Sequence, residues 1–126
     1  MDIGLCALPY KLINQKASYE WSDAERSTYD RHPEISGAML DLVPSLKGIA
    51  KIVRMHHAPF QADLPVEARV LKVASDYAWL FRQMGEKRAQ ELILGKVGEE
   101  YCPEVVDALA EVLRSSRVQE REHCLA

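Results

Sequence analysis

Long hydrophobic runs are absent from this 126-residue sequence. No stretch approaches the roughly 20 consecutive apolar residues that a membrane-spanning helix needs, and residues 1–9 lack the basic region that begins a secretory signal peptide. Cysteine is also scarce. The three cysteines, Cys6, Cys102 and Cys124, are odd in number and match no zinc-ligand spacing. These absences argue against a disulfide framework and predict a cytoplasmic protein without a membrane partner.

An excess of charge of either sign is missing as well. Sixteen Lys and Arg residues stand against 19 Asp and Glu residues, and the two signs are interspersed along the chain, so the formal net charge is only −3. Nucleic-acid-binding domains usually present a strongly basic face. We therefore expect no nucleic-acid partner. The hydrophobic fraction of 48% is ordinary for a globular domain that buries a modest core.

Segments with apolar residues at helical spacing make up most of the chain, and six prolines and six glycines punctuate them. Ser22 and Glu25 form an S-x-x-E pattern, the sequence form of a capping box, which predicts a short helix to about Tyr29. Pro33 suits the first turn of the next helix, where its missing N–H costs nothing. Pro59 predicts a break after the helix that precedes it.

The longest periodic run covers residues 67–84, and further helices are expected at about 89–97 and from Pro103 onward. No segment shows the alternation typical of a strand, so we predict an all-α helical bundle. We expect one domain without an internal boundary over residues 1–115, and a polar, frayed C-terminal tail at 116–126. Along the longest run, the residues predicted to face the core are Val70, Leu71, Ala74, Tyr77, Ala78 and Phe81.

Three of the four histidines stand at expected helix boundaries. His56 and His57 are consecutive, and adjacent residues on a helix differ by about 100° in direction. Both can face one ion only where the helix ends, and Pro59 predicts such an end. Imidazoles suit Fe, Mn or Zn, so His32, His56 and His57, together with the carboxylate of Asp2, predict a mononuclear metal site. The alternative is a surface histidine pair that binds no metal.

Several segments carry a family resemblance through their order along the chain. Residues 1–9 (MDIGLCALP) resemble an H-D-x-G-K segment, residues 32–35 (HPEI) an H-P segment, and His56 and His57 a pair of metal-binding histidines. Residues 68–74 (ARVLKVA) resemble the run before a last metal-binding aspartate, and residues 98–106 the entry of a C-terminal helix. Together these segments resemble the HD-GYP domains, which belong to the HD superfamily of phosphohydrolases.

The resemblance implies an all-α, HD-domain-like bundle with a centre of two or three metals, often containing iron. It also implies hydrolysis of cyclic di-GMP, in which metals activate water and hold the phosphate. Carried over residue by residue, it implies Asp2, His32, His56 and His57 as the ligands of one metal ion. We therefore expect either one divalent metal, namely Fe, Mn or Zn, or no metal at all.

The sequence also departs from the family pattern. Met1 occupies the place of the motif histidine, Leu5 replaces a lysine expected to contact phosphate, and residues 58–63 (APFQAD) replace a glutamate and the G-Y-P segment. Ser75 takes the place of the last metal-binding aspartate in a gapless match. Asp76 stands one step further, about 100° away on a helix, and is an additional candidate ligand. We also expect the N-terminal helices of the full domain to be absent.

These departures leave three functions open. The first is a degenerate HD-GYP-type signalling output domain of a bacterial protein, a non-catalytic regulatory or interaction module. Such a module would cover its exposed apolar face by self-association or by a partner protein or domain. The second is a metal-dependent phosphodiesterase acting on cyclic di-GMP, of which this chain is a fragment. The third is the related HDOD class of regulatory HD domains, whose histidine pair residues 57–59 (HAP) resemble.

Overall fold

The computed structural model describes residues 2–15 and 18–125, with the side chains of all of these except Tyr19 and residues 117–125. Apart from one isolated parallel bridge between Val97 and Tyr101, every regular element in these residues is helical. The predicted all-α fold is confirmed. Among the described residues, no helix is both long and apolar enough to cross a membrane.

The chain divides into two compact units, Met1–His57 and Ala58–Ala126. The sequence predicted one domain without an internal boundary over residues 1–115, and this domain assignment stays a prediction. The junction falls where a loop over residues 58–65 separates two helices. Pro59 and Pro65 stand in this loop, and neither can continue a helix, because proline lacks the N–H that a helix interior requires.

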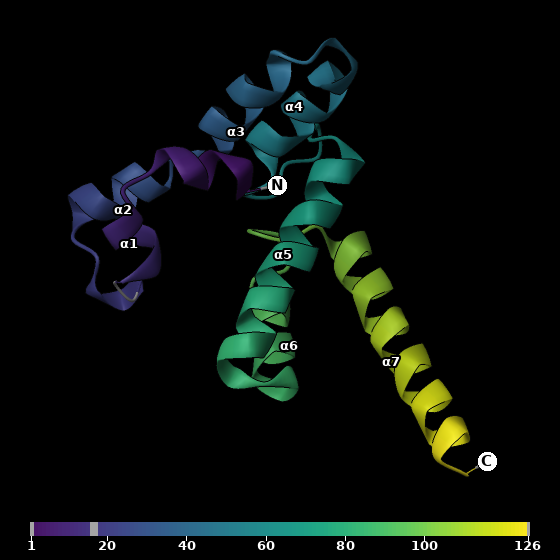
Figure 1. Cartoon of the computed structure of the whole chain (residues 1–126). Helices are drawn as coiled ribbons and strands as arrows, with labels where there is room; N and C mark the ends of the chain where they lie inside the picture. Colours follow the sequence, from purple (N-terminus) through teal and green to yellow (C-terminus); the bar gives the residue numbers. More distant parts are fainter. Residues whose placement is uncertain (1, 16–17, 126) are drawn as a thin grey trace. The chain divides into compact units, whose positions relative to one another are not determined.

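The first unit consists of short helices joined by tight connections (Figure 1). Its capping box forms as predicted, because the Ser22 hydroxyl accepts from the Glu25 N–H and the Glu25 carboxylate accepts from the Ser22 N–H. In chain order, the elements are η1 (Asp2–Ala7), α1 (Tyr10–Asn14), η2 (Ser18–Glu20), α2 (Asp23–Tyr29), α3 (His32–Asp41), η3 (Pro44–Leu46) and α4 (Lys47–Met55).

Helix α3 lies at the centre of the first unit, and both η1 and α4 pack against it (Figure 1). Its buried residues are not the large apolar ones but His32, Pro33, Ser36 and Gly37. Small side chains let two backbones approach closely. A Cβ atom added at Gly37 would lie 2.5 Å from Cγ of Arg54, so the side chain of Arg54 lies directly across this glycine.

Arg54 of α4 joins its helix to α3 by two ion pairs. Its guanidinium donates to the carboxylates of Asp41 and Glu34, which lie on either side of Gly37 along α3. The bond to Asp41, and then that to Glu34, raises the pKa of Arg54 above its ordinary value. Arg54 therefore fixes α4 beside α3 and is already engaged by two carboxylates.

The second unit contains α5 (Val66–Met84), α6 (Glu86–Leu94) and α7 (Pro103–Leu125) (Figure 1). Its core is formed by Val73 of α5, Ile93 of α6, Val106 of α7 and, in the connection before α7, Tyr101. The apolar side predicted for α5 is correct only in part, because Tyr77 packs against this core but other predicted residues do not. Val70 and Phe81 are 45% and 48% exposed, whereas the buried residues of α5 are Ala68, Lys72 and Val73.

The burial of Lys72 explains why the buried face of α5 differs from the predicted one. Its ammonium lies 3.2 Å from the carboxylate of Asp76 and 3.4 Å from that of Glu100. It also stands 5.3 Å from the centre of the Tyr101 ring. A lysine can be buried when its charge is paired in this way. An apolar pattern alone places lysine on the solvent side, so it cannot predict this arrangement.

Two helix ends in the second unit also differ from the predicted ones. Helix α6 ends at Leu94 rather than near Val97, whose backbone pairs with Tyr101 instead. Helix α7 continues to Leu125, so the segment expected to be a frayed tail is helical as far as residue 125. No proline or glycine follows Pro103 to interrupt it. The domain limit at residue 115 stays a prediction.

We predict that Ile93→Ala destabilises the protein by about 2–5 kcal/mol, because it leaves a cavity in the core of the second unit. Ile93 is 1% exposed, whereas its neighbour Leu94 is 59% exposed. The matched control Leu94→Ala should change the free energy of unfolding by no more than about 0.5 kcal/mol. Urea unfolding followed by circular dichroism measures both, and equal effects would contradict this core assignment.

Candidate metal centre

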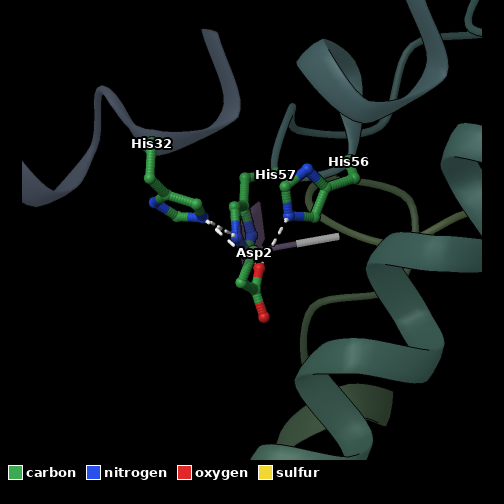
Figure 2. Close-up of side chains that lie close together, drawn as sticks. All are labelled: Asp2, His32, His56 and His57. Atoms are coloured by element: carbon green, nitrogen blue, oxygen red, sulfur yellow. Dashed lines mark hydrogen bonds and ion pairs between the residues drawn. The ribbon is translucent and has the colours of Figure 1, made fainter. Parts of the chain in front are cut away.

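Four side chains that are far apart in the sequence converge in the first unit (Figure 2). Asp2 comes from η1, His32 is the first residue of α3, and His56 and His57 directly follow α4. Each offers one ligand atom, and these atoms all lie within 4.8 Å of one another. The structure therefore brings together all four residues that the sequence singled out for one metal ion.

Helix ends place the three imidazoles. Met55 is the last residue of α4, and the N–H of His56 still bonds to the Val53 carbonyl. Beyond that point the chain leaves the helix. The side chains of His56 and His57 therefore need not point about 100° apart, as adjacent residues of a continuous helix do. Their ring centres lie only 4.0 Å apart. This confirms the expected helix end that the sequence places before Pro59.

Backbone carbonyls orient the two buried imidazoles. Nδ1 of His32 lies 2.8 Å from the Tyr29 carbonyl oxygen, and Nδ1 of His56 bonds to the carbonyl of Val53. A carbonyl accepts but cannot donate, so each Nδ1 carries the proton and donates it. Each Nε2 then keeps its lone pair and faces the cluster. This is the tautomer and orientation that metal-binding histidines typically have.

The spacing between the ligand atoms suits a transition-metal ion. Oδ1 of Asp2 lies 3.7 Å from Nε2 of His32 and 3.7 Å from Nε2 of His56. Nε2 of His57 lies 3.2 Å from Nε2 of His32. Metal–ligand bonds of about 2.0–2.2 Å place neighbouring ligand atoms about 3–3.5 Å apart. These three distances lie close to that range, and no two of the four ligand atoms are more than 4.8 Å apart.

One buried atom gives an independent test of whether a metal fits. Nε2 of His56 is shielded from solvent and has no hydrogen-bond partner among the described residues. Leaving a buried polar atom unsatisfied costs about 1–3 kcal/mol. A cation among the four side chains would use this lone pair, and the carboxylate of Asp2 would supply negative charge. The donor set of three nitrogens and one oxygen fits Fe, Mn or Zn.

Burial also keeps His56 neutral. The pKa of His56 is lowered mainly by its burial, and the nearby His32 lowers it further. The hydrogen bond to the Val53 carbonyl and the charge of Asp2 act in the opposite direction. The balance favours the neutral imidazole, which is the form that binds metals.

A cavity of about 370 Å³ opens beside the cluster. His32 and His57 belong to both the cluster and the cavity wall, so the cavity borders the cluster. Among the residues that the structure describes, no lysine or arginine lines it. Its lining residues are Tyr29, Asp30, His32, Pro33 and His57.

The remaining candidate ligand is Asp76. Asp76 belongs to the second unit and is not among the four clustered residues. Its carboxylate accepts from the Lys72 ammonium and, at 3.1 Å, from the Tyr101 hydroxyl. Burial raises the pKa of Tyr101 well above its ordinary value, so this hydroxyl stays protonated and donates. Asp76 therefore has protein partners of its own. Ser75 bonds to the Lys72 carbonyl.

Sequence reasoning missed the residues that hold the cluster together. Gly4 and Ser36 join η1 to α3, and the carbonyls of Tyr29 and Val53 orient the imidazoles. Every residue has a backbone carbonyl, so a sequence does not indicate which carbonyls will orient a side chain. The only available signal was the glycine two residues after Asp2, at a place where two backbones meet.

We predict that the purified chain holds about one equivalent of Fe, Mn or Zn, measured by elemental analysis. The double variant His56→Ala/His57→Ala should lose it, because half of the donor set is removed. Asp2→Asn should weaken binding about 10-fold or more. Asp63→Asn is the matched control, because Asp63 is exposed and outside the cluster. Equal metal content in all four proteins would refute this ligand assignment.

We predict that the metal-free protein loses stability as the pH falls below about 6.5, the ordinary pKa of histidine. The folded state holds His56 with a lowered pKa. The unfolded state therefore binds a proton first, and the contribution of neutral His56 is complete only above that pH. Thermal melts in a chelator across this range should show the loss. In His56→Gln the dependence on pH should be weaker, and an unchanged slope would show that another group causes it.

Comparison with known proteins agrees with this geometry. A family model described as the HD domain matches residues 1–94, which include all four clustered residues. No curated protein and no solved structure matches the chain significantly. The matched segment covers well over half of the 126 residues. The chain therefore belongs to the HD-domain family.

Proposed function

We propose that this chain binds one divalent transition-metal ion through Asp2, His32, His56 and His57 and acts as a metal-dependent phosphohydrolase. The observation that carries the proposal is the buried Nε2 of His56, which has no hydrogen-bond partner among the described residues and faces a carboxylate and two further imidazoles. Membership of the HD-domain family supports it, because this family includes metal-dependent phosphohydrolases.

The four side chains divide into a buried and an exposed pair. His32 and His56 are each 1% exposed, whereas the side chain of Asp2 is 62% exposed and His57 is exposed. The buried pair fixes the position of the centre, and of the four residues His32 and His57 also line the neighbouring cavity. A bound divalent metal would activate water and polarise a phosphoryl oxygen. The protein contributes the orientation of the donors and the wall against which a substrate lies.

The nature of the metal decides whether the centre can react. Zinc prefers four ligands in a tetrahedral shell, and four protein ligands would close that shell as in structural sites. Iron and manganese accept more ligands, so they would leave positions for water and substrate. Hydrolysis is therefore expected with Fe²⁺ or Mn²⁺ rather than with Zn²⁺.

The charges around the cavity favour a phosphodiester over a phosphomonoester. Among the described residues, the cavity is lined by the carboxylate of Asp30 and by no cationic side chain. A dianionic monoester has more charge to compensate than a singly charged diester. We propose kinship with the HD-GYP type on the order of its sequence segments, and cyclic di-GMP is accordingly the first natural diester to test.

A second candidate function is a non-catalytic regulatory or interaction module that keeps the ion for structural reasons. Three observations favour it. Arg54, which stands two residues before the histidine pair in the sequence, is held by Asp41 and Glu34. Leu5 stands where the HD-GYP segment that residues 1–9 resemble has a lysine expected to contact phosphate. The second unit also has an apolar hollow of about 800 Å³, lined in part by Tyr77, Phe81 and Leu113, which suits self-association or a partner.

We predict that the Mn²⁺- or Fe²⁺-loaded protein hydrolyses bis-p-nitrophenyl phosphate faster than p-nitrophenyl phosphate, since only the diester avoids a second uncompensated charge. A chelator and the double variant His56→Ala/His57→Ala should each abolish turnover. Asp63→Asn should retain it. Release of the chromophore is followed by absorbance, and cyclic di-GMP is assayed in parallel by chromatography of the products.

The outcomes separate the two candidate functions. Turnover that follows metal content supports the hydrolase. One equivalent of metal without turnover of any of the three substrates supports the regulatory module, and light scattering should then show a dimer or larger assembly. Absence of both metal and turnover would overturn the proposal.

A further inference from the structure

Ser36 is the one fully buried hydroxyl-bearing residue among the core residues of the described chain, with 0% exposure. It lies on α3 one turn after His32, so both residues are on the same face of the helix. Its Oγ accepts from the N–H of Gly4 at 2.8 Å. This buried hydrogen bond joins η1 to α3 directly beside the metal ligands.

Gly4 permits this contact because it has no side chain. A Cβ atom at this position would lie 2.4 Å from the His32 carbonyl oxygen and 2.7 Å from the Ser36 nitrogen. The backbone of η1 therefore rests directly on the first turn of α3. Gly4 is only two residues from Asp2, so its position determines where the carboxylate of Asp2 can reach.

Asp2 itself has little else to hold it. Its side chain is 62% exposed, and among the described residues its carboxylate pairs only with His32 and His56. The element that carries it, η1, is a 3-10 helix of six residues, a kind of helix with weak intrinsic stability. Without an anchor, η1 would sample many conformations.

We propose that Ser36 is a positioning residue that sets Asp2 into the metal centre through its hydrogen bond to Gly4. The inference rests on the proposed metal binding and adds a residue that does not touch the ion. With the hydroxyl in place, η1 is ordered before the metal binds. The free energy of metal binding is then not reduced by the entropic cost of ordering η1. Without the hydroxyl, the buried N–H of Gly4 is unsatisfied, which favours release of η1.

The test compares metal affinity in Ser36→Ala with that in Ser45→Ala, a matched control because Ser45 is exposed in η3. We expect Mn²⁺ or Zn²⁺, titrated against a competing chelator, to bind about 10–100-fold more weakly to Ser36→Ala. Ser45→Ala should bind like the wild type. Circular dichroism of each variant shows whether the helices are retained.

A double-mutant cycle separates positioning from general destabilisation. If Ser36 acts through Asp2, Ser36→Ala should cause no further loss of metal affinity in an Asp2→Asn background. A merely structural effect would weaken binding by the same factor in both backgrounds. Gly4→Ala disturbs the partner of Ser36 in the same hydrogen bond. Its loss of metal affinity should also disappear in the Asp2→Asn background.

The outcomes distinguish this inference from the function on which it rests. The positioning role is overturned if the wild type and Ser36→Ala bind metal equally well. It is also overturned if the losses of metal affinity in Ser36→Ala and Asp2→Asn add in the double variant, and in both cases the metal centre itself is retained. If the wild type binds no metal, the proposed function fails and this inference fails with it. A loss in Ser36→Ala and in Gly4→Ala that vanishes without the Asp2 carboxylate would establish the role.

Discussion

The close approach of η1 and α4 to the small-residue face of α3 is the constraint on which the candidate site depends. Gly4 and Ser36 bring one backbone onto α3, and Gly37 makes room for Arg54 on the other side. Larger residues at these positions would push the flanking elements outward. Because two of the four ligands lie on α4's end and one on η1, such a shift would pull the donor atoms out of bonding range. The packing of α3 therefore sets the geometry of the centre.

The net charge of the proposed metal centre would take the place of the cationic side chains that its surroundings lack. Neutral imidazoles contribute no charge and Asp2 contributes one negative charge, so a divalent ion would leave the centre with a net charge of about +1. In the part of the chain that the structure describes, the neighbouring cavity has no cationic side chain. Attraction of a phosphate would then come from the metal itself, and a singly charged diester is the ligand that such a centre neutralises.

The two units have different chemistry. The first contains the clustered ligands and the contacts that hold them. The second is built on an aliphatic and aromatic core, with Lys72 paired to Asp76 and Glu100 at its edge. Membership of the HD-domain family spans both, because the matched segment runs to residue 94. Removal of the ion is accordingly expected to act on the first unit.

The sequence by itself determined the helical class, the start of α2 at its capping box and the helix ends at which three histidines stand, because these depend on local spacing and on proline and glycine. The grouping of these histidines with Asp2 was predicted from the order of segments that resemble a family, and not from local spacing. Tertiary structure alone decided which face of α5 is buried, since the pairing of Lys72 with distant carboxylates overrides its polarity. It also decided the division into two units and the roles of Gly4 and Ser36. Contacts between residues 32 positions apart in the chain leave no periodic pattern, so only the folded chain reveals them.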